Sequence, residues 1–191
     1  MRGNTNLGDM NQVSDGLMGV SVVLPILNEE RDLRESVSAI LAQNFSAPFE
    51  VILALGPSTD RTTQIAKEIA AGDSRVVLVD NPTGRTANGL NAAIASAKYS
   101  IISRIDGHAE ISPTYLRDAT ELLNKTGAVN VGGIMAAVGK SKFEKAVATA
   151  MRSPLGVGSS RFHTGGSAGP ADTVYLGTFK KSALLEAGGY D

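Results

Sequence analysis

The sequence contains no cysteine. That absence excludes disulfide bonds, thiolate metal sites and a cysteine nucleophile, and it leaves the cellular compartment open. The chain also lacks an excess of either charge, because 18 lysine and arginine residues meet 19 aspartate and glutamate residues, for a net charge of −1. A nearly neutral chain gives no electrostatic indication of nucleic-acid binding.

Long apolar runs are missing as well. No stretch approaches the roughly eighteen residues that a membrane-spanning helix needs, and residues 1–18 have neither the basic nor the apolar region of a secretory signal. That segment holds three asparagines and three glycines without periodicity, so we expect a disordered tail there. Residues 19–191 then form one domain, which is long enough to bury a real core.

Three common nucleotide-binding motifs are also absent. A dinucleotide-dependent oxidoreductase needs G-x-G-x-x-G directly after its first strand. Here the first apolar run, residues 20–27, is followed by Asn28-Glu29-Glu30, whose acids would repel a pyrophosphate. The full G-x-x-x-x-G-K-[ST] loop of a P-loop enzyme is missing, because Ile134 stands where the first glycine would precede Gly139-Lys140-Ser141. The glycine-rich loop of a nucleotidyltransferase is missing after the first strand. These absences argue against all three classes.

What the sequence does contain is a regular alternation of strand and helix patterns. The predicted strands are residues 20–27, 49–55, 75–79, 99–105, 129–135 and 173–179. The predicted helices are residues 29–43, 58–71 with Ser58-Thr59-Asp60 as the cap, 87–97, 113–124, 142–151 and 181–187. Strands joined by helices at this rhythm predict a mixed, mainly parallel sheet in a three-layer α/β sandwich.

Two of the predicted strands end in acidic residues. Residues 20–27 stop at Asn28-Glu29-Glu30, and residues 99–105 stop at Asp106-Gly107-His108. Ligands bind at the carboxyl ends of the strands in open α/β sheets, so we expect Asn28 and Asp106 to be adjacent at one edge of a cleft. If the segment after residue 105 is extended, Asp106 and His108 point the same way and can face one cation. A carboxylate with an imidazole favours Mn²⁺ over Mg²⁺.

Each of these acidic and histidine residues also has a structural interpretation. Asp106 with Gly107 is a common turn pair, and His108 can be an ordinary surface histidine. Asn28 and Glu29 can cap the following helix. Capping is compatible with contact to a nucleotide, and we expect both roles.

Two arginines have alternatives of the same kind. Arg85 beside Gly84 can be solvated, or it can meet a diphosphate at a helix start. Arg104 is interpreted as the partner in a structural ion pair.

Five segments together resemble family 2 glycosyltransferases of the GT-A fold. They are residues 20–30, residues 50–62, residues 84–91, residues 104–109, and residues 172–181 with the Gly188-Gly189-Tyr190-Asp191 turn. In this resemblance Asp106 and His108 occupy the place of the family's Asp-x-Asp motif. The Asp-x-His variant and Asp172-Thr173-Val174-Tyr175 look most like bacterial exopolysaccharide glucosyltransferases of the succinoglycan type.

The resemblance implies an enzyme, a hexosyltransferase that moves a sugar from a nucleotide-diphosphate sugar to a saccharide or polyprenyl-linked acceptor. The implied donor-binding residues are Pro25, Asn28, Glu29, Gly56, Arg85 and Asp106. Asp172 is implied on the acceptor side, and Asp106 with His108 is implied as the site of a Mn²⁺ or Mg²⁺ cofactor. The implied location is cytoplasmic, including the inner face of the plasma membrane, and the full-length protein is expected to be membrane-associated.

The chain departs from the family pattern at two places. The acids that normally help hold the donor base correspond to Leu55-Gly56. A UDP-sugar is the expected donor, but this departure leaves the base open. The family's general base follows the Gly-Gly-Phe-Asp turn, so the catalytic base is expected beyond Asp191, and the chain is expected to be a C-terminally truncated enzyme. The alternative is a catalytically inactive fragment that binds a nucleotide sugar.

The required chemistry can be stated independently of the resemblance. A leaving nucleotide diphosphate needs its charge neutralised by a cation or by arginines. The attacking hydroxyl must lose a proton to a positioned carboxylate.

Residues 153–169 contain five glycines and interrupt the alternation of strands and helices. We therefore expect a mobile lid or acceptor-side loop there, in which His163 is neither ligand nor base. Exposed apolar surface is expected around Leu184 and Leu185.

Overall fold

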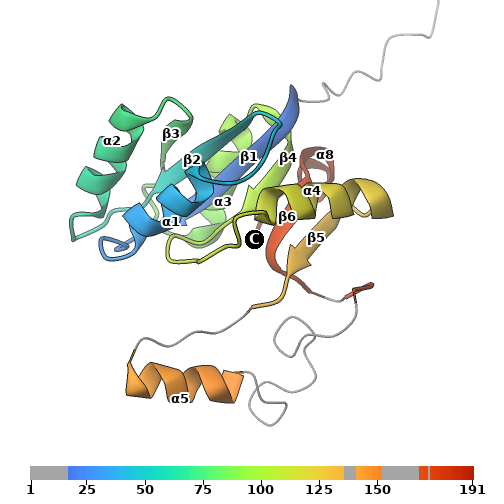
Figure 1. The fold of residues 1–191 in the computed structure, drawn as a ribbon. Coiled ribbons are helices and arrows are strands. Elements are labelled where there is room, and N and C mark those ends of the chain that lie inside the picture. The colour runs from blue at the N-terminus through green and yellow to red at the C-terminus, as the bar shows by residue number, and fades with distance from the viewer. Residues whose placement is uncertain (1–16, 136–140, 152–167, 172) are drawn as a thin grey trace, which may run out of the picture.

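A computed structural model describes residues 17–135, 141–151, 168–171 and 173–191 (Figure 1). The strands are β1 (Leu17–Ile26), β2 (Phe49–Leu55), β3 (Val76–Asp80), β4 (Tyr99–Arg104), β5 (Asn130–Gly133) and β6 (Tyr175–Lys180). The helices are α1 (Leu33–Leu41), α2 (Thr62–Gly72), α3 (Thr86–Ser96), α4 (Tyr115–Thr126), α5 (Lys142–Met151) and α8 (Lys181–Glu186).

The six strands form a single mixed sheet in the order β3-β2-β1-β4-β6-β5. The strands β3, β2, β1 and β4 run parallel to one another, whereas β6 runs antiparallel to both β4 and β5. This arrangement confirms the predicted mainly parallel sheet. Because parallel neighbours end at the same edge, the carboxyl ends of the four parallel strands share one rim of the domain.

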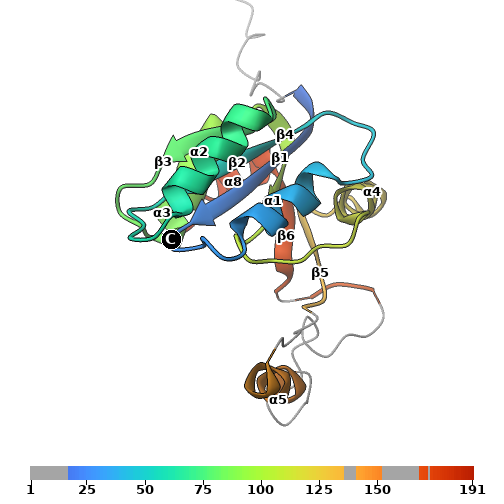
Figure 2. The ribbon, with the colours of Figure 1, turned by 60° about the vertical axis from the view of Figure 1, so that its left-hand side comes forward.

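Helices cover both faces of the sheet (Figure 1, Figure 2). Val22 and Leu24 of β1 pack on one face with residues of α1 and α2, and Val23 packs on the other face with residues of α3 and α8. The central strands are therefore buried on both sides, which is why they appear in the sequence as continuous apolar runs rather than alternating ones. A smaller cluster of α4 and β5 residues extends the core towards the β5 edge.

Several predicted boundaries match the structure and others move. Strand β2 and helix α5 begin and end as predicted. Strand β1 begins at Leu17, inside the segment predicted as a tail, because this end of the strand pairs with β4 at Tyr99.

The expectation of exposed apolar surface on α8 is half wrong. Leu184 is buried in the core cluster that α8 shares with α3, whereas Leu185 on the same helix is 54% exposed.

Candidate functional site

The carboxyl ends of β1 and β4 lie side by side. These strands are parallel neighbours, with Val23 opposite Arg104, so the chain leaves both strands at the same rim. Glu29 and His108 then meet directly, with 2.9 Å between Glu29 Oε1 and His108 Nδ1. The predicted adjacency of the two strand ends is confirmed, although the side chains in contact are Glu29 and His108 rather than Asn28 and Asp106.

The turn after β1 is bonded to the turn after β2. Asn28 Oδ1 accepts a hydrogen bond from the Thr59 amide at 2.9 Å, and the Asn28 amide donates to Ser58 Oγ at 3.1 Å. The Glu29 amide donates to Thr62 Oγ1 at 2.7 Å, and Glu30 Oε2 accepts from the next turn as well. We call these two turns, residues 28–30 and 58–62, the donor rim.

The predicted capping role of Asn28 and Glu29 is wrong. Helix α1 begins only at Leu33, so the side chain of Asn28 is too far along the chain to cap it. Asn28 instead adopts a left-handed backbone conformation, with φ 56°, which asparagine tolerates better than most residues. This turn directs the Asn28 side chain across to β2 rather than along the helix.

Asp106 is held by an arginine two residues before it. Arg104 Nε donates to Asp106 Oδ1 at 3.1 Å, which confirms the ion pair expected for Arg104. The segment that follows is a turn closed by the Ala109 amide on the Asp106 carbonyl at 2.9 Å. The segment is therefore a turn rather than the extended stretch that was expected.

His108 is tied to Glu29 rather than to Asp106. The hydrogen bond that His108 donates to the Glu29 carboxylate is the main cause that raises the pKa of His108 above its usual range. Gly107 permits this approach, because a Cβ at that position would come within 3.1 Å of Glu29 Cγ. A larger residue at position 107 would thus require the side chains of Ile26 and Glu29 to shift.

The described residues contain no cluster of three or more histidine, aspartate or glutamate side chains arranged around one metal ion. A cation bound here would take at most two ligands of these types from the described residues. Such a ligand set fits a hard divalent cation that shares its coordination with the phosphates of a bound substrate. The atoms that could bind such a cation are the carboxylate oxygens of Asp106 and the ring nitrogen of His108 that is not bonded to Glu29.

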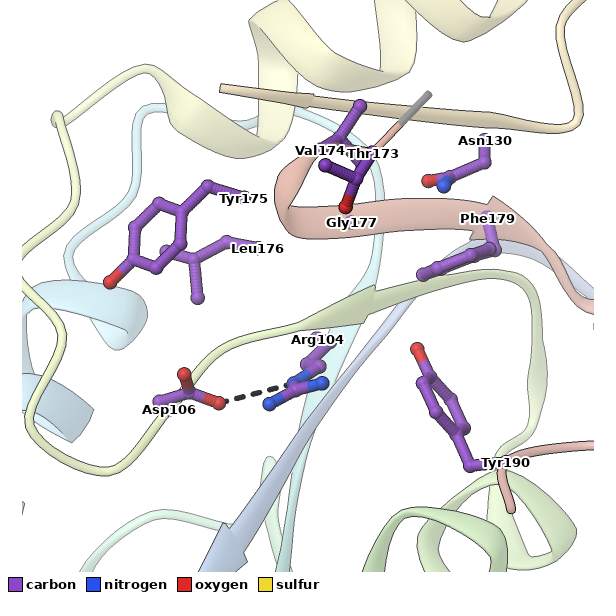
Figure 3. Close-up of a pocket in the computed structure, with 10 residues that line it drawn as sticks. All are labelled: Arg104, Asp106, Asn130, Thr173, Val174, Tyr175, Leu176, Gly177, Phe179 and Tyr190. Atoms are coloured by element: carbon purple, nitrogen blue, oxygen red, sulfur yellow. Dashed lines mark hydrogen bonds and ion pairs between the residues drawn. The ribbon is translucent and has the colours of Figure 1, made fainter. Parts of the chain in front are cut away.

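A cavity of about 400 Å³ opens beside Asp106 (Figure 3). It is lined by Arg104, Asp106, Asn130, Thr173, Val174, Tyr175, Leu176, Gly177, Phe179 and Tyr190. Arg104 lies between Asp106 and the ring of Tyr190, and the aromatic rings come from β6 and the C-terminal turn (Figure 3). Burial raises the pKa of Tyr175 and of Tyr190, so both phenols stay neutral near pH 7.

The aromatic lining was not among the site residues predicted from the sequence. A signal for it exists, because Tyr175, Gly177 and Phe179 follow one another at the spacing of two that places residues on one face of a strand. Tyr190 lies in the turn that resembles the family's Gly-Gly-Phe-Asp segment, but it was not predicted to line a site. No periodicity marks Asn130, which reaches the cavity through the antiparallel pairing of β5 with β6.

The other residues predicted to bind the donor lie along the same edge of the sheet, on its β3 side. The Gly56 amide donates to the Ile26 carbonyl at 2.8 Å, which joins the ends of β1 and β2. Pro25 is half-buried in β1 opposite Ala54. Arg85 is exposed at the N-terminus of α3, and no hydrogen bond or ion pair between the described side chains joins it to Asp106.

Two expectations fall on segments that the structure does not describe. Asp172 lies outside the described residues, and so does most of the predicted loop at residues 153–169, with His163 in it. The expected general base beyond Asp191 lies outside the chain.

A protein-family model described as "Glycosyl transferase family 2" matches residues 21–186. The chain is 34% identical over 182 residues to succinoglycan biosynthesis protein ExoA of Rhizobium meliloti (strain 1021), which covers 93% of this chain and 55% of that protein. It is 40% identical over 108 residues to the putative glycosyltransferase EpsE of Bacillus subtilis (strain 168), covering 56% of this chain and 38% of that one. The chain thus spans about half the length, or less, of these curated relatives.

Two solved structures share the fold. The structure of S. aureus TarS 1-349 in complex with UDP has a TM-score of 0.68 at 20% identity and covers 91% of this chain and 50% of that one. The mannosyltransferase PcManGT from Pyrobaculum calidifontis, in complex with GDP-Man and Mn²⁺, has a TM-score of 0.63 at 22% identity, with 90% and 47% covered.

Proposed function

The chain belongs to glycosyltransferase family 2, and we propose that it takes part in moving a sugar from a nucleotide-diphosphate sugar to a hydroxyl of a saccharide or lipid-linked saccharide. The biological setting that we propose is bacterial exopolysaccharide or cell-envelope glycan synthesis, which is consistent with the relative named for succinoglycan biosynthesis. The observation that carries the proposal is the convergence of the donor rim, Asp106 and the cavity at one edge of the sheet.

The donor would lie along this edge with its base near Pro25 and Gly56. Asn28 and Glu29 stand in the middle of the rim. Arg85 stands at the start of α3, where a guanidinium and the helix N-terminus both favour a diphosphate. UDP is the expected nucleotide, and the similar structures that hold UDP or GDP-Man support a nucleotide sugar in general.

A divalent cation, Mn²⁺ or Mg²⁺, would be held by Asp106 as principal protein ligand and by His108 as auxiliary ligand. Its contribution would be to neutralise the charge that develops on the leaving diphosphate. Glu29 would orient the His108 ring through Nδ1, as carboxylates commonly do for ligating histidines. Arg104 supplies a positive charge at the same carboxylate in the absence of the cation.

The acceptor would enter the cavity beside Asp106. Its aromatic rings offer apolar faces with polar tips, and a cavity of about 400 Å³ has room for a sugar ring. Asp172 remains a candidate on this side, and the carboxylate that takes the proton from the acceptor is proposed to follow Asp191 in the longer protein.

None of the described helices is both long and apolar enough to span a bilayer. A location in the cytoplasm, at the inner membrane face, is part of the proposal.

The test measures binding of a panel of UDP- and GDP-sugars by calorimetry, with and without Mn²⁺. We expect Mn²⁺ to strengthen binding of one donor and Asp106→Ala to remove that increase. The matched control is Glu110→Ala, which removes an exposed acid four residues further on and should leave the increase in place. Equal Mn²⁺-dependent binding by Asp106→Ala and the parent chain would refute the assignment.

The same panel should then be tested for transfer, with glycoside and polyprenyl-linked acceptors and product detection by mass spectrometry. Transfer by the 191-residue chain would place the general base within residues 1–191. Binding without transfer would favour the alternative, a fragment that binds the donor and needs the following segment for turnover.

A further inference from the structure

Asn91 of α3 is bonded to both polar groups of the Tyr190 backbone. Asn91 Nδ2 donates to the Tyr190 carbonyl at 2.8 Å, and the Tyr190 amide donates to Asn91 Oδ1 at 2.8 Å. The two residues are 99 positions apart, so no local structure holds them together. The two hydrogen bonds from the Asn91 side chain thus tie the C-terminal turn directly to α3.

The turn is shaped to receive Asn91. Gly188 and Gly189 have φ values of 86° and 88°, a region that suits glycine and few other residues. A Cβ at Gly189 would come 2.5 Å from Asn91 Oδ1. The backbone thus approaches the Asn91 amide more closely than any other residue at position 189 would allow.

The Tyr190 ring, which these two hydrogen bonds from Asn91 hold in place, belongs to the proposed active site. The Arg104 guanidinium lies 5.9 Å from the centre of the Tyr190 ring, and Phe179 meets the same ring edge-on at 6.1 Å. Arg104 also donates from Nε to Asp106 at 3.1 Å. The guanidinium is thus shared between a ring face and a carboxylate (Figure 3).

We propose that Asn91 is a positioning residue that acts through Tyr190 to hold Arg104 between the ring and Asp106. The inference rests on the proposed function, in which Asp106 binds a divalent cation. Arg104 and that cation compete for the same carboxylate, and the ring face gives the guanidinium a second attractive partner. When Asn91 no longer holds the turn, Tyr190 is free to leave, Arg104 pairs with Asp106 alone, and the cation must displace it.

The experiment compares the full chain with Asn91→Ala, with Tyr190→Ala and with the double variant. Asn124→Ala is the matched control, because Asn124 is an exposed asparagine on α4. Nuclear magnetic resonance of ¹⁵N-labelled protein follows two signals without any ligand, the Tyr190 amide and the Arg104 Nε–H. Calorimetry then measures UDP binding with and without Mn²⁺.

We expect Asn91→Ala to speed hydrogen exchange of the Tyr190 backbone amide with solvent by about tenfold or more. It should also shift the Arg104 Nε–H signal. The Mn²⁺-dependent part of UDP binding should weaken by about tenfold, which is the lower end of the cost of losing an outer-shell partner at a metal site. UDP binding without metal should be unchanged. Tyr190→Ala should reproduce the effects on Arg104 and on Mn²⁺, and the double variant should add nothing further.

Two results would overturn the inference. One is a Tyr190 amide that stays as protected in Asn91→Ala as in the parent. The other is release of that amide with no change at Arg104 and none in Mn²⁺-dependent UDP binding. A parent chain that does not bind UDP in Mn²⁺ would instead refute the proposed function, and the two ligand-free signals would still decide whether Asn91 positions Arg104.

Discussion

The donor rim and the cavity stand at the same edge of the sheet but are held together in different ways. The rim is closed by hydrogen bonds between residues 30 to 33 positions apart, from one β–α unit to the next. The cavity combines short-range contacts, such as that of Arg104 with Asp106, with hydrogen bonds between residues 61 and 99 positions apart. The long-range bonds run from the Tyr115 hydroxyl to the Leu176 carbonyl and between Asn91 and Tyr190.

This difference indicates that the rim and the cavity contribute to the site in different ways. A rim made from adjacent units and several polar contacts is organised before any ligand arrives, which suits the proposed recognition of the nucleotide part of the donor. A cavity assembled from distant segments depends on each of a few long-range contacts. Loss of an acid from the rim should therefore change metal-dependent binding little, whereas loss of Asp106 at the cavity should change it strongly.

The largest expected effect compares one carboxylate from each region. Asp106→Asn should weaken Mn²⁺-dependent UDP binding by about a hundredfold or more, since even loss of an outer-shell partner costs about 10–100-fold. Glu30→Gln should leave that binding within about threefold, because the Glu30 carboxylate accepts from the Arg61 amide at the rim. Calorimetry with and without Mn²⁺ checks both. Equal losses would mean that the rim acid also takes part in binding the metal.

The next effect compares the two glycines of the C-terminal turn. Gly189→Ala should lower the free energy of unfolding by about 2–3 kcal/mol, since it adds a clash with Asn91 to the cost of a positive φ. Gly188→Ala should cost only about 1 kcal/mol, because the new methyl group would meet nothing within 4 Å. Urea unfolding of both variants measures the difference. Equal costs would show that the turn does not need its close approach to Asn91.

A smaller effect separates conformation from hydrogen bonding at the rim. Asn28→Ala should cost about 2 kcal/mol in the free energy of unfolding, because it loses the bond from the Thr59 amide and places alanine at a positive φ. Asn28→Gly loses the same bond but tolerates the φ, so its cost should be about 1 kcal/mol. If glycine proves as costly as alanine, the φ of Asn28 contributes nothing measurable.

The smallest effect is a pH dependence of the free energy of unfolding. It arises from the contact between Glu29 of the rim and His108 in the turn after β4. The pKa of His108 is raised above 6.5 by Glu29, so its stabilising contribution is complete below about pH 6.5 and is lost as the pH rises through the raised value. His108→Gln should remove this part of the pH dependence. Urea midpoints across pH 5.5–8.5 in the presence of a chelator compare the two proteins. A parent and variant that differ equally at every pH would contradict the prediction.

Much of the fold could be predicted because its signals are local. Strand β2 was placed correctly from one apolar run, and the shared edge for Asn28 and Asp106 followed from strand alternation alone. The start of α1 was misplaced because Asn28 forms bonds with Ser58 and Thr59, and no pattern within residues 28–33 reveals that partner. The pairing of His108 was missed for the same reason, since Glu29 is 79 positions away.

The sequence by itself determined the class of fold, the rim that carries the site and the family resemblance, because buried parallel strands need continuous apolar residues and their ends need turn-forming and polar ones. Only the tertiary structure decided which side chains meet there. It paired His108 with Glu29 and Asp106 with Arg104, and it brought Tyr190 to the cavity through Asn91. Those choices depend on close packing between segments up to 99 positions apart, and the separation of residues along the chain carries no information about contact at that range.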